Sequence, residues 1–152
     1  MCGIAGELRF DHQPADLAAV ERITHHLAPR GPDAQGFHSQ GPIAFGHRRL
    51  KVMDLAEASG QPMIDSDLGL SMVFNGAIYN YPELRDELKA LGYRFFSGGD
   101  TEVLLKGYHA WGTDLLPKLN GMFAFAIWER DSQQLFIARD RLGVKPLYLS
   151  RT

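Results

Sequence analysis

The sequence predicts an α+β fold in which β-sheets form layers and helices lie outside them. Segments with strand and helix patterns follow the order strand, helix, strands, two helices, strands. Single strands and helices do not alternate regularly, which excludes a doubly wound parallel sheet, and closely spaced strands indicate hairpins. A chain of 152 residues fits one domain, which buries roughly two thirds of its unfolded surface.

The first third of the chain predicts two strands and one helix. The apolar run GIAGELRF at residues 3–10 is typical of a strand. Asp16 can cap a helix with apolar residues at near-helical spacing, and the APRGPD segment at residues 28–33 ends it. Residues 43–55, IAFGHRRLKVMDL, predict a strand interrupted by a polar turn.

The middle of the chain predicts a strand followed by two helices. Residues 70–81, LSMVFNGAIYNY, form a predicted strand in which Asn75 and Gly76 are typical of a hairpin bend. Asn80 resembles the start of a capping box, and the helix after it ends at Gly92. The next predicted helix covers residues 101–111.

The C-terminal part predicts strands again. Asp100 is the expected cap of the helix before them. The runs MFAFAIWE at residues 122–129 and QLFIARD at 134–140 are separated by a short RDSQ turn, which predicts an antiparallel hairpin. The segment PLYLS at residues 146–150 predicts a last strand.

Composition narrows the class of protein. With 45% hydrophobic residues, 22% charged residues and a formal charge of -2, the chain has neither the composition of a disordered protein nor the basic excess of a nucleic-acid binder. No apolar run suits a signal peptide or the ~18 residues of a membrane span, so no membrane partner is expected. A single cysteine cannot form an internal disulfide, which favours the cytoplasm.

That single cysteine stands at position 2. Removal of Met1 before a small residue would leave Cys2 with a free α-amino group beside its thiol, so that nucleophile and base share one residue. The alternative is a small buried apolar residue, the commoner situation for a lone cysteine.

Other residues supply the groups that a thiol attacking an amide requires. The side chain of Asn75 and the N–H of Gly76 suit an oxyanion hole, although a hairpin bend explains them equally. Arg48 or Arg49 can bind a carboxylate, and Asp100 can hold an ammonium group. Both arginines also suit a solvated strand edge, and Arg30 and Asp33 are candidate ion-pair partners.

These motifs together resemble the class II glutamine amidotransferase domain, an N-terminal-nucleophile hydrolase, in its asparagine-synthetase-like branch. The resemblance covers nearly the whole chain in order. Within that branch, the segments RRLKVMDLAEASGQPM, VFNGAIYNY and YRFFSGGDTEVLLKGYHAWG are most similar to N-acetylglutaminylglutamine amidotransferases. The motifs that carry it are MCGIAG, RGPD, GHRRLKVMDL, FNGAIYNY, GDTEVLL, GMFAFAIWE and ARDRLGVKPLY.

The resemblance implies a fold and a set of roles. The fold is a four-layer αββα sandwich of two antiparallel sheets, and the reaction is hydrolysis of L-glutamine without a metal or cofactor in this domain. Cys2 corresponds to the nucleophile and Asn75 with Gly76 to the oxyanion hole. The glutamine-binding positions correspond to Arg49, Leu50, Lys51, Val52, Met53, Asn75, Gly76, Ala77 and Asp100.

The resemblance also implies a second domain. Relatives continue into a synthetase domain that binds ATP and magnesium and receives ammonia through a tunnel, so residues 1–152 are expected to be the glutaminase half of a longer enzyme, and a homo-oligomer is compatible with it. Asparagine synthetases usually have Glu where this chain has Ala77, which predicts weaker glutamine binding. Alternatives are a glutamine-binding domain without hydrolysis, a hydrolase of another amide, or a structural domain with a buried Cys2.

Overall fold

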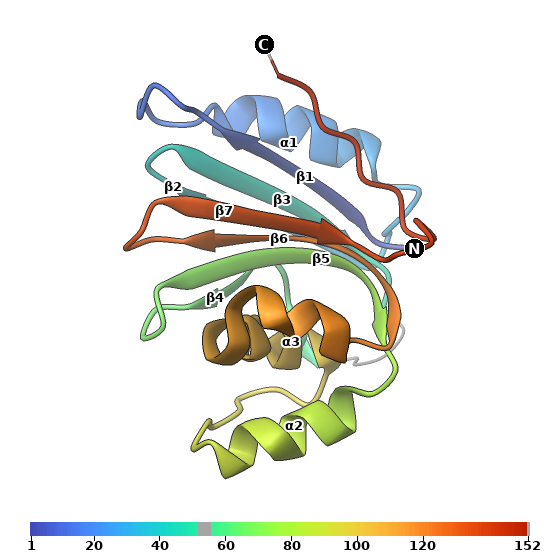
Figure 1. Cartoon of the computed structure of the whole chain (residues 1–152). Coiled ribbons are helices and arrows are strands. Elements are labelled where there is room, and N and C mark those ends of the chain that lie inside the picture. Colours follow the sequence, from blue (N-terminus) through green and yellow to red (C-terminus); the bar gives the residue numbers. More distant parts are fainter. Residues whose placement is uncertain (52–55, 152) are drawn as a thin grey trace.

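Two antiparallel sheets lie face to face in the computed structural model, which describes residues 1–51 and 56–151 (Figure 1). The three-stranded sheet has the order β1-β3-β2 and the four-stranded sheet the order β4-β5-β6-β7. The strands are β1 (Gly3–Leu8), β2 (Ala34–Gln40), β3 (Ile43–Arg49), β4 (Met63–Asp65), β5 (Leu70–Ile78), β6 (Gly121–Glu129) and β7 (Gln134–Arg139).

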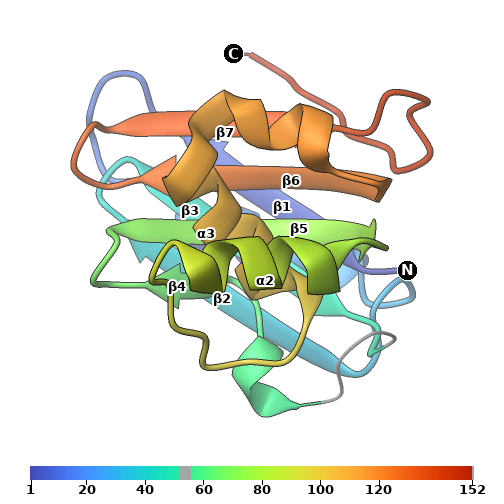
Figure 2. The same cartoon turned by 60° about the horizontal axis from the view of Figure 1, so that its bottom comes forward.

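Helices cover both outer faces of this sandwich. Helix α1 packs on β1 and β3, whereas α3 packs on the four-stranded sheet and α2 packs on α3, in front of it in Figure 2. The predicted αββα layers are therefore confirmed. The helices are α1 (Leu17–His26), α2 (Tyr81–Ala90) and α3 (Asp100–Trp111), with short 3-10 helices η1 (Glu57–Ser59) and η2 (Gly112–Lys118).

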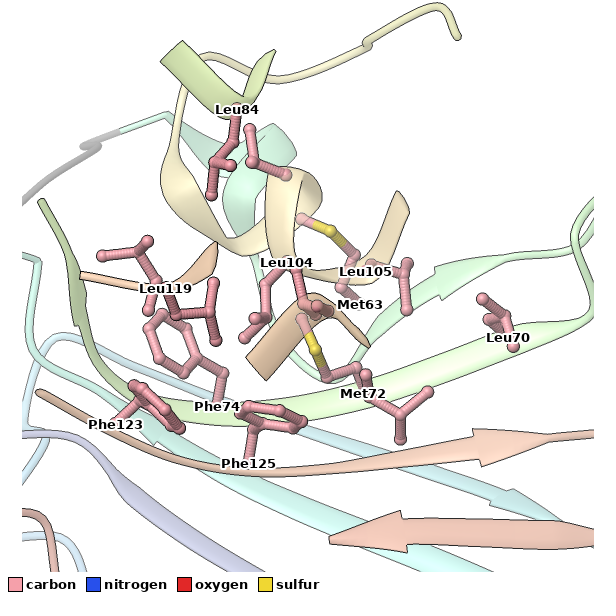
Figure 3. Close-up of a cluster of buried hydrophobic side chains, with 14 of the residues drawn as sticks. Met63, Leu70, Met72, Phe74, Leu84, Leu104, Leu105, Leu119, Phe123 and Phe125 are labelled. Carbon is pink, nitrogen blue, oxygen red and sulfur yellow. The ribbon is translucent and has the colours of Figure 1, made fainter. Parts of the chain in front are cut away.

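Strands β5 and β6 are buried on both faces, so successive side chains enter two different cores. Phe74 and Phe125 point toward the helices, where Figure 3 shows them beneath Leu104. Val73 and Trp128 point the other way and pack against the three-stranded sheet. This alternation decides which residues of β5 face the layer between the sheets.

Several predicted elements are confirmed by the structure. The N-terminal strand, the helix capped by Asp16 and the β6–β7 hairpin form as expected, and the Asp16 carboxylate accepts a hydrogen bond from the N–H of Ala19 at 2.9 Å. No helix among the described residues is long and apolar enough to cross a membrane.

Other predictions were wrong. β5 runs straight through Asn75 and Gly76, which pair with β6 instead of making a bend. Residues 146–150 form no strand, and strands β2 and β4 were not predicted. Gly99, not Asp100, precedes the first helical residue of α3, and the Asn80 side chain caps nothing because it bonds the backbone of Lys118 and Asn120.

Candidate functional site

A cavity of about 160 Å³ lies where the N-terminus, the end of β3 and the middle of β5 meet. About 150 Å³ suffices to enclose a molecule such as benzene, so this is space for a small molecule. Residues from seven separate segments form its wall: Met1, Cys2, Arg49, Leu50, Ser59, Gln61, Phe74, Asn75, Gly76, Ala77, Asp100, Thr101, Met122 and Lys145.

Cys2 is half-buried and directly precedes strand β1. Its sulfur accepts a hydrogen bond from the N–H of Leu50 at 3.4 Å and lies 3.7 Å from the carbonyl oxygen of Leu50. β1 pairs with β3, with Gly3 opposite Arg48, so the strand register sets Cys2 beside the residues that follow β3. The thiol is thereby fixed at the cavity wall while remaining accessible.

The RGPD loop fixes both segments that carry these groups. The guanidinium of Arg30 donates to the carbonyl oxygen of Cys2 at 3.2 Å, and the carboxylate of Asp33 accepts from the N–H of Lys51 at 2.8 Å. A Cβ at Gly31 would collide with the backbone of Arg48, so only glycine permits this close approach. Arg30 and Asp33 therefore act on backbone groups of the site rather than as an ion pair.

Strand β5 presents two residues to the cavity from the layer between the sheets. Asn75 and Ala77 share the face of Val73, which points toward the three-stranded sheet. The Asn75 residue is only 4% exposed. Among the described residues its side-chain amide has no hydrogen-bond partner, so the donor capacity of the amide remains for a bound molecule.

The N–H of Gly76 points to a part of the β5 edge that no strand of residues 1–51 or 56–151 covers. β4 pairs with β5 only from Leu70 to Met72. Beyond that point, the N–H of Phe74 donates to the Gln61 side chain at 2.6 Å and the N–H of Ile78 donates to the Asp100 carboxylate at 2.9 Å. Alternate N–H groups of a strand share an edge, so the N–H of Gly76 lies between these two, at the cavity.

Glycine is required at position 76 for packing reasons. A Cβ there would collide with the carbonyl oxygen of Met122 on the neighbouring strand and crowd the backbone of Phe123. The Asn-Gly pair therefore reflects close packing of β5 on β6, together with one side-chain donor and one backbone donor directed at the same cavity. This is the arrangement that stabilises an oxyanion.

Opposite charges lie on the cavity wall. Arg49 ends β3 and Asp100 begins α3, and both are almost completely buried. The Arg49 guanidinium donates to the carbonyl oxygen of Ala56 at 3.0 Å. A buried cation and a buried carboxylate around one small cavity suit an α-amino acid, which carries a carboxylate and an ammonium group.

His47 lies beneath the site, between the two sheets, and is fully buried. One ring nitrogen lies 3.1 Å from the carbonyl oxygen of Phe74, the residue before Asn75, and the other has no partner among the described residues. Burial lowers the pKa of His47 to about 4, so the ring is neutral at pH 7. The neutral ring joins β3 to β5 next to Asn75 and Gly76.

The structure brings most of the predicted site residues together. Cys2, Arg49, Leu50, Asn75, Gly76, Ala77 and Asp100 all line the cavity. Lys51 does not line it, because its ammonium pairs with Glu57 at 3.0 Å. Val52 and Met53 lie outside the described residues.

Sequence reasoning missed several wall residues: Ser59, Gln61, Phe74, Thr101, Met122 and Lys145. Thr101 and Lys145 stand within motifs quoted above, GDTEVLL and ARDRLGVKPLY, which are the only signal that pointed toward them. Gln61 stands within RRLKVMDLAEASGQPM, but its contact with β5 depends on how the loop before β4 folds. Among the described residues no cluster of His, Cys, Asp and Glu is arranged to hold a metal ion.

The fold is that of a glutamine amidotransferase domain. A family model described as "Glutamine amidotransferase domain" matches residues 1–152, so the chain belongs to this family. Glutamine-hydrolyzing asparagine synthetase 3 of Bacillus subtilis is 42% identical over 154 residues, covering 99% of this chain and 25% of that protein. Glutamine-hydrolyzing asparagine synthetase 1 of Arabidopsis thaliana is 35% identical, covering 98% of this chain and 25% of that protein.

Solved structures support the same family. Glutamine phosphoribosylpyrophosphate amidotransferase from B. subtilis, in complex with ADP and GMP, superposes with a TM-score of 0.55 and 26% identity, covering 67% of this chain and 24% of that one. An allosteric regulatory enzyme of purine biosynthesis gives a TM-score of 0.55 and 25% identity over 71% of this chain and 25% of that one. The chain thus spans about a quarter of the length of the relatives that it matches.

Proposed function

We propose that this chain hydrolyses the side-chain amide of L-glutamine and that Cys2 is the nucleophile. The observation that supports the proposal most strongly is that one small cavity contains the thiol, two spare hydrogen-bond donors on β5, a buried arginine and a buried carboxylate. Arg49 would bind the α-carboxylate and Asp100 the α-ammonium group, which places the side-chain amide toward Cys2.

The proposed reaction starts once Met1 has been removed. The Cys2 α-amine takes the thiol proton, and the sulfur forms a bond to the amide carbon while the carbonyl oxygen becomes an oxyanion held by Asn75 and Gly76. The carbon–nitrogen bond then breaks, and the amine returns the proton to the leaving nitrogen, which departs as ammonia. Water attacks the remaining thioester, releasing glutamate and the thiol.

Ala77 is the observation behind a second candidate, a domain that keeps the fold and the cavity but does not hydrolyse glutamine. Ala77 lines the cavity and supplies no carboxylate for the substrate ammonium. Asp100 is the acidic residue of the wall that is left for this contact. We therefore expect Ala77 to weaken glutamine binding and not to abolish hydrolysis.

The experiment that tests the proposal combines intact mass with activity. The unaltered chain should lack Met1 and release ammonia from glutamine. The Cys2→Ala variant should hydrolyse glutamine at least about a thousandfold more slowly and keep the same melting temperature. A chain that retains Met1, or a Cys2→Ala variant that hydrolyses glutamine equally well, contradicts the proposal. Hydrolysis of N-acylated amides in preference to glutamine would instead indicate a different amidase.

The role of the whole enzyme is a further part of this proposal. The asparagine synthetase relatives are named as glutamine-hydrolyzing, and this chain covers 25% of the first of them. We propose that ammonia passes to a synthetase domain of the same polypeptide, which uses ATP and Mg²⁺ to amidate an acceptor carboxylate in the cytoplasm. The proposed acceptor is aspartate or, because of the motif sequences, N-acetylglutaminylglutamine. Assays of ATP-dependent amidation with each acceptor distinguish the two.

A further inference from the structure

Lys145 is a buried cation on the cavity wall to which the proposed reaction assigns no role. With Met1 in place it is 5% exposed, and it stands in the loop that follows β7, beside which the N-terminus lies in Figure 1. Among the described residues, the one hydrogen-bond acceptor of its ammonium group is the thioether sulfur of Met1, at 2.8 Å. A thioether is a weak acceptor, and lysine is almost never fully buried unless it is paired.

The loop is built to hold Lys145 in this position. The buried carboxylate of Asp140 accepts hydrogen bonds from the N–H groups of Phe123, Val144 and Lys145 at 3.1, 2.8 and 3.0 Å. Burial alone would raise the pKa of Asp140, but these N–H groups outweigh burial and hold the pKa below its usual value. Asp140 therefore accepts hydrogen bonds from the backbone of the loop, whereas the Lys145 ammonium donates to the Met1 sulfur.

Loss of Met1 changes the surroundings of this ammonium group. Removal of Met1, which the proposed function requires, takes away its acceptor and opens the space beside Cys2. A few covalent bonds of about 1.3–1.8 Å separate the Met1 sulfur from the Cys2 nitrogen, so the ammonium lies within about 10 Å of that nitrogen. That is about one Debye length at about 0.1 M ionic strength, and the path is partly buried.

We propose that Lys145 is a second cation of the glutaminase site, which stabilises the negative charge that forms on the Cys2 sulfur and on the substrate oxyanion. This inference rests on the proposed function. Arg49 would bind the α-carboxylate of the substrate, which is charged before and after the reaction. Lys145 would stabilise the negative charge on the sulfur and the oxyanion, which exists only during the reaction. A fixed cation in a partly buried site lowers the barrier without tightening substrate binding.

The test compares Lys145→Met, which keeps the length of the side chain, with Lys145→Arg, which keeps the charge. Lys89→Met is the matched control, because Lys89 lies on the exposed side of α2. Lys145→Met should lower kcat about tenfold with KM within a factor of three, Lys145→Arg should recover most of the rate, and Lys89→Met should change neither.

A second readout does not depend on activity. Cys2 is the only cysteine in the sequence, so alkylation rates report on this thiol alone. A nearby cation accelerates anionic iodoacetate relative to neutral iodoacetamide. The ratio of the two rates should fall at least threefold in Lys145→Met and recover in Lys145→Arg, whereas a structural role would not move it.

The outcomes separate this inference from the proposed function. An unchanged kcat and an unchanged alkylation ratio in Lys145→Met overturn the role of Lys145, even if Cys2→Ala abolishes hydrolysis. Activity that survives Cys2→Ala overturns the proposed function, and the alkylation ratio still decides whether Lys145 acts on the thiol. If Lys145→Met does not fold, Lys145→Gln replaces it with the same two readouts.

Discussion

Two buried polar clusters flank the start of helix α3, and they use their charges differently. On one side, the carboxylate of Glu102 accepts the N–H groups of Phe96 and Ser97, the Ser97 hydroxyl and the Lys106 ammonium at 2.5 to 3.1 Å. On the other side, the cavity holds donors that the protein leaves for a ligand, the Asn75 amide and the N–H of Gly76.

The difference separates polar groups that stabilise the fold from those available for chemistry. Burial alone would raise the pKa of Glu102, but its hydrogen bonds from Lys106 and Ser97 outweigh burial and lower it. Every charge in that cluster is paired inside the protein, so little capacity remains for a ligand. In the cavity, spare donors around a thiol are an arrangement that stability alone does not explain.

The largest effect is expected from breaking the paired cluster. Glu102→Gln removes the closer of two charge partners of the buried Lys106, leaving Asp65 at 3.9 Å, and should lower the free energy of unfolding by about 3–5 kcal/mol. Glu102 does not line the cavity, so the folded variant should keep the kcat of the unaltered chain. Urea unfolding and steady-state glutaminase assays at low temperature check the two parts.

The matched control is Glu87→Gln. Glu87 also pairs with a lysine, Lys118 at 2.8 Å, but both side chains are well exposed. An exposed pair contributes at most about 1 kcal/mol, so this variant should unfold almost as the unaltered chain does. Equal stability losses in the two variants would contradict the distinction between a buried and an exposed pair.

Replacing a donor of the cavity should lower activity and leave stability almost unchanged. Asn75→Ala removes one of two oxyanion donors and should lower kcat by about 10²- to 10³-fold, with a melting temperature within a few degrees. Asn80→Ala is the control, because the Asn80 amide bonds only the backbone of Lys118 and Asn120. An Asn75→Ala variant that is unstable but fully active per folded molecule would place Asn75 among the structural groups.

The same comparison explains what could be predicted from the sequence. Helices and strands with a clear apolar period were predicted, because burial of one face fixes that period. Asn75-Gly76 was ambiguous, since the same pair is typical of a hairpin, and only the register with β6 shows that the strand continues. β2, with three glycine or polar positions among its first five residues, has no strong pattern of its own and depends on pairing with β3.

Site residues that lie in recognisable motifs could likewise be predicted. Wall residues that reach the cavity from loops could not. Cys2, Arg49 and Asp100 carry groups whose chemistry is visible in the sequence. Gln61 and Lys145 reach the cavity through loops, and their partners, the N–H of Phe74 and the Met1 sulfur, are distant in sequence. Such contacts are set by tertiary packing, which local patterns do not encode.

A smaller effect is expected from pH, through His47 between the sheets. The pKa of His47 is about 4 in the fold and near 6.5 in the unfolded chain, so the unfolded state takes up a proton that the fold excludes. The stability contributed by the neutral ring is complete above pH 6.5 and should fall by up to about 3 kcal/mol as the pH approaches 4. Urea unfolding between pH 7 and 4.5 measures this loss.

Replacement of the ring tests the cause. His47→Gln keeps a donor toward the carbonyl oxygen of Phe74 and should flatten the stability profile between pH 6.5 and 4.5. His26→Gln, at the exposed end of α1, should leave the profile unchanged. An identical pH dependence in both variants would assign the loss to other groups.

The smallest effect is expected from replacing Asp100, which lines the cavity and lies two residues before Glu102 in the sequence. Asp100→Asn keeps an oxygen for the N–H of Ile78 but removes the charge proposed for the substrate ammonium. Loss of a charge-assisted hydrogen bond of about 1.5–3 kcal/mol should raise the KM for glutamine roughly 10- to 100-fold, with kcat within a few-fold. Asp86→Asn, on the exposed side of α2, is the control for loss of one acidic residue. A fall in kcat at constant KM would show that Asp100 acts during the reaction and not in binding. Asp100 would then have the same kind of role as the proposed oxyanion donors.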